Sequence, residues 1–92
     1  MISREGDRLL LKGRLTMSTV PALYESGLRH LASEDLKVDF SGVEAVDSSA
    51  ISMLLGWTRA AKKQGRMLRV ENLPEDFRSL AHLYGVDEML PG

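Results

Sequence analysis

Residues 36–64 read LKVDFSGVEAVDSSAISMLLGWTRAAKKQ, and this stretch decides the fold. Its first five residues alternate apolar and polar side chains, a period of two that predicts a strand with one buried face. Ser41-Gly42 is expected to end that strand. Asp47, Ser48 and Ser49 then supply short polar side chains that can accept hydrogen bonds from the free N–H groups of a first helical turn. A helix is therefore expected over residues 48–64.

The expected helix carries two apolar stripes. Ile51, Leu54 and Leu55 fall at the spacing of a face that packs on a sheet. At about 100° per residue, Met53 and Trp57 lie on roughly the opposite side of the helix. This second stripe predicts an interface with a partner, because a helix packed on one layer does not require it. The alternatives are that another layer of the same domain covers Met53 and Trp57, or that they are scattered surface side chains, which are normal in soluble proteins.

The predicted partner-binding surface is an apolar patch bordered by hydroxyl groups and positive charge. We expect Trp57 to anchor the partner and to be partly exposed in the free domain, because a large exposed apolar patch usually marks an interaction site. The surface comprises Asp47, Ser48, Ser49, Ser52, Met53, Gly56, Trp57, Arg59 and Ala60.

The length and composition of the chain predict one globular domain over residues 1–92. Its 92 residues suffice for a single core, and its content of 43% hydrophobic and 27% charged residues is ordinary for a soluble protein. A net charge of −1 does not suggest nucleic-acid binding, and the absence of cysteine rules out disulfides and thiolate metal sites. The start of the chain lacks the apolar run of a signal peptide, and no stretch approaches the ~20 apolar residues of a membrane span. We therefore expect a cytoplasmic protein.

The remaining segments predict strands and helices that alternate along the chain. A hairpin turning at Gly6-Asp7 is expected to join strands over residues 1–5 and 8–12, with Gly13 closing the second strand. Helices are expected from Ser18 or Thr19 to near residue 33 and from Pro74 to residue 85, and a strand is expected over residues 67–71. The resulting order is β-β-α-β-α-β-α, in which the βαβ crossovers require parallel strands. We therefore predict an α/β fold with a four-stranded mixed sheet and three helices mainly on one face.

Several segments of the chain resemble a known family. They are Val38-Asp39-Phe40-Ser41-Gly42-Val43, Val46-Asp47-Ser48-Ser49-Ala50, Leu54-Leu55, Ala61-Lys62-Lys63-Gln64-Gly65 and the closing stretch from Phe77 to Val86. Together they are similar to the STAS domain, which occurs in anti-sigma-factor antagonists and in regulatory subunits of transporters. Within that family, the single-domain form and the closing Ala81-His82-Leu83-Tyr84-Gly85 look most like the STAS subunit of a phospholipid-transport ABC complex of Gram-negative bacteria.

The resemblance implies a non-catalytic subunit of a phospholipid-transport ABC transporter that serves outer-membrane lipid asymmetry. Such a subunit would bind and stabilise or activate the cytoplasmic ATPase through the helix from Ser48 to Lys63, and would reach the inner membrane only through this partner. The alternative is an anti-sigma-factor antagonist that releases a kinase when Ser48 is phosphorylated, with Ser49 as the neighbouring candidate. Ala50 stands where the antagonist pattern usually has glycine, which weakens this alternative.

The two serines also have a reading that does not depend on the resemblance. A hydroxyl at a helix N-terminus sits where backbone N–H groups and the helix dipole favour an anion, so a phosphate there would be accommodated. Ser48 and Ser49 could instead be helix caps alone, each contributing ~1 kcal/mol. The two roles are compatible.

No catalytic site, metal site or cofactor is expected from the remaining residues. Asp39 and Asp47 lack a nucleophile or a histidine beside them, so they do not form an acid/base pair. His30 and His82 are not at a metal-ligand spacing. The glycines are not grouped into a phosphate-binding loop. The sequence therefore argues against an enzyme.

Overall fold

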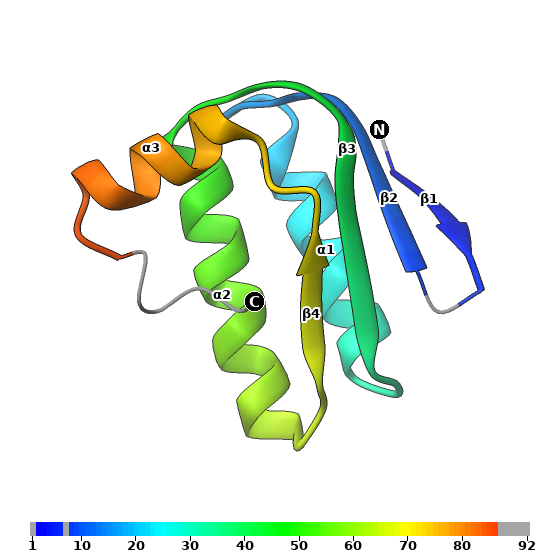
Figure 1. Ribbon diagram of the computed structural model, residues 1–92. Helices are drawn as coiled ribbons and strands as arrows, with labels where there is room; N and C mark the ends of the chain where they lie inside the picture. The colour runs from blue at the N-terminus through cyan, green and yellow to red at the C-terminus, as the bar shows by residue number, and fades with distance from the viewer. Residues whose placement is uncertain (1, 7, 87–92) are drawn as a thin grey trace.

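The computed structural model describes residues 2–6 and 8–86, and it places three helices on one face of a sheet (Figure 1). The elements in chain order are β1 (Ile2–Glu5), β2 (Arg8–Leu15), α1 (Val20–Leu31), β3 (Leu36–Val46), α2 (Ser48–Gln64), β4 (Leu68–Glu71) and α3 (Glu75–Leu83). The strands lie side by side in the order β1-β2-β3-β4. β2, β3 and β4 are parallel, and β1 adds to the edge of this parallel part by pairing antiparallel with β2. The α/β class with three helices is therefore confirmed.

The core lies between the sheet and the helices. Along β2 and β3, buried apolar residues alternate with more exposed ones, as a sheet covered on one face requires. The buried apolar residues of these strands are Leu9, Leu11, Leu15, Leu36, Val38 and Phe40. Phe40 meets Phe77 of α3 edge to face, with ring centroids 5.5 Å apart, so the last helix is fastened to the middle of the sheet.

β2 and β3 are both longer than the sequence predicts, so the expected ends at Gly13 and at Ser41-Gly42 are wrong. β2 continues through Gly13, which has a φ of 82°, to the fully buried Leu15. β3 continues to Val46, and the pairing between the two strands passes through two register shifts. These irregularities let the ladder continue past residues that read as terminators. The extension brings the end of β3 directly to the start of α2.

The bounds of α2 are those predicted, Ser48–Gln64. Asp47 is its N-cap, and Gly65 ends it with a φ of 66°, the left-handed conformation that glycine adopts most readily. Ile51 and Leu54 face the core as expected. Leu55 also packs against the core, but it is only half-buried.

The second apolar stripe of α2 is covered by α1. Trp57 is completely buried and Met53 is 2% exposed, so the expectation of a partly exposed Trp57 in the free domain is wrong. Gly27 of α1 gives the reason, because its missing side chain leaves the space that the Trp57 indole occupies. The Trp57 indole N–H also donates to the carbonyl of Tyr24, at 3.0 Å. Of the sequence interpretations, cover by another part of the same domain is the one that holds.

Two further expectations concern turns and the membrane. The predicted hairpin turn at Gly6-Asp7 includes Asp7, which lies outside the described residues; Gly6 itself has a φ of 63°. Among the residues that the structure describes, no helix combines the length and the apolar character needed to cross a bilayer.

Candidate functional site

Asp47 joins three segments at the start of α2. Its Oδ1 accepts hydrogen bonds from the backbone N–H of Ser49, at 2.8 Å, and from the Ser49 hydroxyl. Its Oδ2 accepts from the backbone N–H of Met17, at 3.1 Å, and its own N–H donates to the carbonyl of Leu15 at the end of β2. One residue therefore fixes the end of β2, the loop that follows it and the first turn of α2.

These hydrogen bonds stabilise the ionised form of Asp47. The Ser49 hydroxyl has the largest effect and holds the pKa of the Asp47 carboxyl below its usual value of 3.8. Burial opposes it, and the backbone N–H groups of Ser49 and Met17 lower the pKa further by smaller amounts. Asp47 is therefore an ionised acceptor at neutral pH. This suits a helix cap, whose charge also complements the helix dipole, and does not suit a proton donor.

The structure distinguishes the two candidate switch residues. The Ser49 hydroxyl is engaged by Asp47 and half-buried. Ser48 occupies the first position of the helix and is exposed, and within the described residues its hydroxyl has no hydrogen-bond partner. Ser48 is thus the more accessible hydroxyl of the pair.

A shallow groove of about 320 Å³ lies between the first halves of α1 and α2. Three residues from each helix line it: Val20, Pro21 and Tyr24 from α1, and Ser49, Ser52 and Met53 from α2. Its lining is mostly apolar, with two serine side chains on the α2 side and the Tyr24 ring on the α1 side. Because Ser49, the residue after Ser48, lines the groove, the groove lies beside the start of α2.

The predicted partner-binding residues fall into a solvent-facing set and a covered set. Ser48, Ser52 and Arg59 are exposed, and they share one face of α2 with the half-buried Leu55. Met53, Gly56 and Trp57 are buried against α1, and Ala60 is half-buried. Tyr24 lies over Gly56, where a Cβ would come within 2.6 Å of the Tyr24 ring. The surface expected from α2 alone is therefore a surface of α1 and α2 together.

The sequence interpretation did not identify the α1 residues of this surface. The periodicity predicts Val20 and Tyr24 on the apolar face of the first helix and Pro21 in its first turn, but it does not show that they border α2. A signal was available in Gly27, a glycine on the apolar face of a predicted helix, which indicates a close approach of another element.

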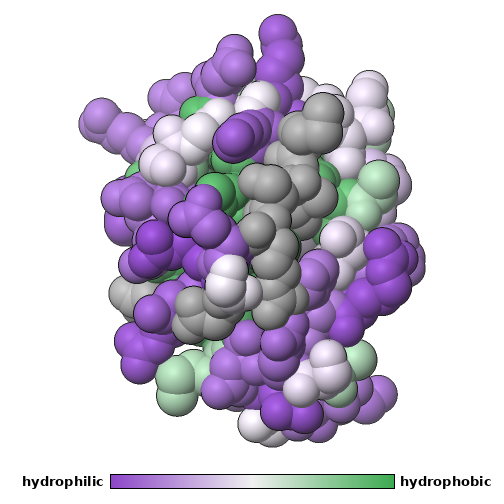
Figure 2. Space-filling view, turned by 90° about the vertical axis from the view of Figure 1, so that its right-hand side faces the viewer, coloured by the Kyte–Doolittle hydropathy of each residue, from purple (hydrophilic) through white to green (hydrophobic). Residues whose placement is uncertain are grey.

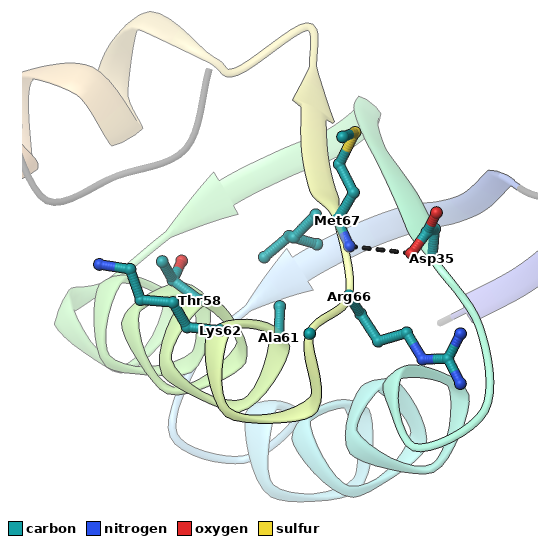
Figure 3. A pocket seen from close by; sticks show the side chains of 8 residues that line it. Asp35, Thr58, Ala61, Lys62, Arg66 and Met67 are labelled. Atoms are coloured by element: carbon teal, nitrogen blue, oxygen red, sulfur yellow. Dashed lines mark hydrogen bonds between the residues drawn. The ribbon is translucent and has the colours of Figure 1, made fainter.

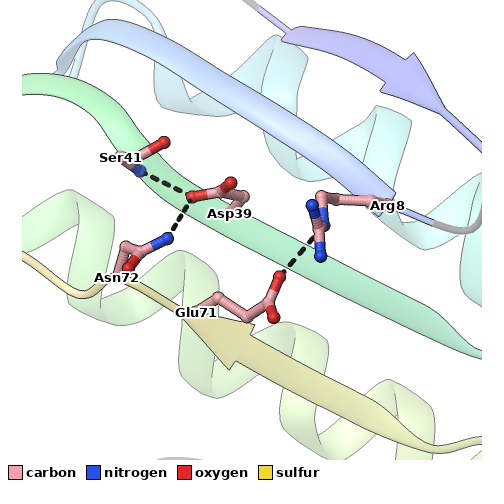
Figure 4. Close-up of polar contacts among 5 residues, drawn as sticks. All are labelled: Arg8, Asp39, Ser41, Glu71 and Asn72. Carbon is pink, nitrogen blue, oxygen red and sulfur yellow. Dashed lines mark hydrogen bonds and ion pairs between the residues drawn. The ribbon is translucent and has the colours of Figure 1, made fainter.

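The face of the sheet that carries no helix is polar. Asp39, 8% exposed, accepts at Oδ1 from the Ser41 N–H at 2.8 Å and from the Asn72 amide at 3.0 Å (Figure 4). These bonds, with that from Asn72 the largest influence, lower the pKa of Asp39. Beside it, Arg8 Nε and Glu71 Oε1 form an ion pair at 3.0 Å that spans β3. The side of the molecule next to β1 is likewise mainly hydrophilic (Figure 2).

This polar network connects strands of the sheet. Asn72 holds its position with a φ of 57°, so the amide that reaches Asp39 comes from a tight turn after β4. In the described ranges, no group of three or more His, Asp or Glu side chains could hold a metal ion. His30 is occupied locally, with Nδ1 2.8 Å from the Ser26 carbonyl.

Comparison with known proteins identifies relatives over almost the whole chain. The family model described as "Mlab, STAS domain" matches residues 1–91. The intermembrane phospholipid transport system binding protein MlaB of Escherichia coli (strain K12) is 32% identical over 88 residues, which cover 94% of this chain and 89% of that protein. The anti-sigma-B factor antagonist of Bacillus subtilis (strain 168) is 29% identical over 82 residues, which cover 87% of this chain and 74% of the relative.

A solved assembly contains a chain of the same fold. In the structure of the Acinetobacter MlaFEDB complex in its ATP-bound Vtrans2 conformation, one chain superimposes with a TM-score of 0.77. The match covers 92% of each chain at 23% sequence identity. At this identity the match bears on the fold alone.

Proposed function

The chain belongs to the STAS domain family of the MlaB type, and from this membership we propose that it is the non-catalytic binding subunit of a phospholipid-transport ABC transporter. It binds the transporter's ATPase at the cytoplasmic face of the inner membrane and stabilises or activates it, and the transport serves lipid asymmetry of the outer membrane. The name of the E. coli relative supports the transport system, and the ATP-bound MlaFEDB assembly supports an ATPase-containing partner.

The observation that carries this proposal is the surface formed by α1 and α2 at the start of α2. The groove between the helices offers an apolar floor, and the exposed face of α2 presents Ser48, Ser52 and Arg59 beside it. A mostly apolar hollow with a few polar groups at its rim is the usual composition of a protein-binding surface. Met53 forms part of the floor, and Trp57 and Gly56 act indirectly by holding α1 against α2.

A substitution at Ser52 tests this surface without disturbing the core. Ser52 is exposed and lines the groove, so Ser52→Arg places a long side chain across it while keeping a good helix former. We expect affinity for the purified ATPase subunit, measured by titration calorimetry, to fall at least about tenfold, which corresponds to 1.4 kcal/mol. Ser79→Arg, the same change at an exposed position of α3, is the matched control and leaves affinity unchanged. Wild-type affinity for the Ser52 variant would place the binding surface elsewhere.

A second candidate function is that of a phospho-regulated anti-sigma-factor antagonist. The B. subtilis relative supports it by name, and the exposed, unengaged hydroxyl of Ser48 at the helix N-terminus supports it by position. In this role the partner is a kinase, and a phosphate on Ser48 adds about −1.5 to −2 charge at the surface described above. A pull-down from native extract separates the two functions, because it recovers either a membrane-complex ATPase or a soluble kinase.

A further inference from the structure

The charges of the chain are unevenly distributed in space. Residues 29–37 and 62–69 hold six of the 12 basic residues but only two of the 13 acidic ones. The loop between α1 and β3 and the turn between α2 and β4 both lie at the end of the molecule opposite the start of α2 (Figure 1). We call this region the basic end; its cations are Arg29, Lys37, Lys62, Lys63, Arg66 and Arg69. A chain of net charge −1 therefore has one strongly positive end.

The cations of the basic end are available to a ligand. Arg29, Lys62, Lys63, Arg66 and Arg69 are exposed and Lys37 is half-buried. The ion pair described for the folded chain joins Arg8 to Glu71, and none of these six cations has a carboxylate partner within residues 2–6 and 8–86. Lys37 and Arg69 are direct neighbours on β3 and β4, so two like charges stand side by side on the sheet. Like charges directly opposite each other are destabilising, and Glu71, which lines a hollow with both residues, offsets only part of this repulsion because it is paired with Arg8.

An apolar side chain stands in the middle of these cations. Met67 is 53% exposed and borders two hollows. The larger, of about 440 Å³, is lined by Lys62 and Arg66 together with Thr58 and Ala61 (Figure 3). The smaller, of about 200 Å³, is lined by Lys37 and Arg69. Asp35 lies at both and accepts a hydrogen bond from the Met67 N–H, at 2.9 Å, which fixes the position of Met67.

We propose that the basic end binds directly to the surface of a membrane that contains anionic phospholipids. The lipid phosphates pair with the exposed cations around the two hollows, and the Met67 side chain enters the boundary between headgroups and acyl chains. Clusters of four to eight basic side chains are attracted to anionic lipid surfaces, and an apolar side chain among them adds buried area. An acidic protein surface would also attract these cations, but charge attraction alone does not account for the exposed Met67 between the two hollows.

The charge distribution also sets the orientation of the bound domain. Outside the basic end the sequence holds six basic and 11 acidic residues, so an anionic surface favours an approach by the basic end. α2 then points away from the membrane, and its 17 residues place Ser48 about 25 Å above the surface. This direct contact differs from an association through a protein partner alone, which the sequence suggests, and it does not rest on the proposed function.

A fluorescent variant tests insertion. Trp57 is completely buried and gives a constant background, so Met67→Trp adds one reporter at the proposed contact. Its emission should shift to the blue, and become shielded from quenchers, when vesicles of phosphatidylcholine mixed with phosphatidylglycerol are added. Vesicles of phosphatidylcholine alone should cause no shift. A shift of equal size with both vesicles, or with neither, would overturn the proposal.

Charge removal tests the cations with the native Met67 in place. Each basic side chain near an anionic surface gives roughly a fivefold gain in binding, so the double variant Lys62→Gln, Arg66→Gln should bind phosphatidylglycerol vesicles roughly thirtyfold more weakly in a co-sedimentation assay. The matched control removes two exposed cations from elsewhere, Arg14→Gln and Arg78→Gln, and should bind as the wild type does. Equal losses in both variants would mean that net charge alone is responsible. Unchanged vesicle binding combined with a lost affinity for the ATPase subunit would identify a protein partner instead. Either result would overturn the membrane contact.

Discussion

Gly27 of α1 lies directly beneath the indole of Trp57 on α2. A Cβ on Gly27 would stand 2.3 Å from Trp57 Cε2, closer than any real contact of that kind. One turn away the two helices exchange roles: Gly56 of α2 lies beneath the ring of Tyr24 on α1. Each helix thus receives an aromatic side chain of the other, which explains how α2 buries apolar residues on two sides.

Gly27→Ala should destabilise the domain although alanine is the better helix former. Helix propensity alone would stabilise the variant by up to about 1 kcal/mol. The added methyl group collides with a completely buried ring, and overpacking of this kind costs about 1–3 kcal/mol or more. Chemical denaturation shows whether the unfolding free energy falls or rises. Glu25→Ala, at an exposed position of the same helix, is the control. A Gly27 variant with a higher midpoint than wild type would contradict the close packing.

The fluorescence of Trp57 should report a core residue. Because Trp57 is the only tryptophan and is completely buried, the free protein should emit in the blue and resist quenching by acrylamide. Trp57→Ala should cost about 3–5 kcal/mol of unfolding free energy, as removal of a buried aromatic side chain does. Red-shifted emission that is readily quenched would mean that α1 does not cover α2 in solution.

Leu54 and Leu55 provide a matched pair for the orientation of α2. Leu54 is completely buried, and Leu54→Ala should lower the unfolding free energy by about 2–5 kcal/mol. Leu55 is half-buried on the side of Ser48 and Ser52, so Leu55→Ala should cost less than half as much. The denaturation midpoints of the two variants measure this difference. Equal losses of unfolding free energy would mean that α2 is rotated about its axis relative to this structure.

Asp47 should make stability depend on pH in the acid range. Its pKa in the folded protein is below 3.8, so the unfolded chain binds more protons in acid, and the stabilisation from Asp47 is complete above about pH 4. It is lost as the pH falls through the lower, folded-state pKa. Asp47→Asn retains a good N-cap but cannot ionise, so its unfolding free energy should fall less steeply between pH 4 and pH 2. Glu25→Gln, on the exposed side of α1, is the control for the loss of a carboxylate. If the unfolding free energy of Asp47→Asn fell with pH as steeply as that of the wild type, the role of Asp47 would be contradicted.

A charge at Ser48 should affect binding and leave folding almost unchanged. Ser48→Asp puts a carboxylate at an exposed first helical position, where the dipole favours it, so stability should stay within about 1 kcal/mol of wild type. If Ser48 contacts the partner, titration calorimetry should show weaker binding to it. Ser48→Asn is the uncharged control of similar size. Equal affinity of all three proteins would leave Ser48 without a role at the interface.

The sequence predicts those parts of the fold that depend on local patterns. The bounds of α2 follow from the capping residue Asp47 and from Gly65, and the parallel strands follow from the alternation of strands and helices. The ends of β2 and β3 do not follow, because Gly13 and Gly42 are residues that usually end strands and here take part in an irregular ladder. Whether a ladder continues depends on the neighbouring strand, which local sequence does not specify.

The candidate site is predicted in position but not in composition. Asp47, Ser48 and Ser52 could be placed from the start of one helix and its periodicity. Periodicity also separates Met53 and Trp57 from the sheet-facing stripe, but it does not say what covers them. That depends on how closely α1 approaches, which is decided by the absence of one side chain at Gly27.

The register between β2 and β3 limits how this chain can change in length. From its first to its last pairing, β3 advances nine residues while β2 advances seven. Deleting one residue between positions 40 and 46 would turn the following side chains to the opposite face of the sheet, and Asp47 would no longer meet Met17. Loops such as residues 32–35 carry no such register. In an alignment of relatives, gaps should therefore collect in that loop and avoid residues 40–46, whatever the identities of the residues there.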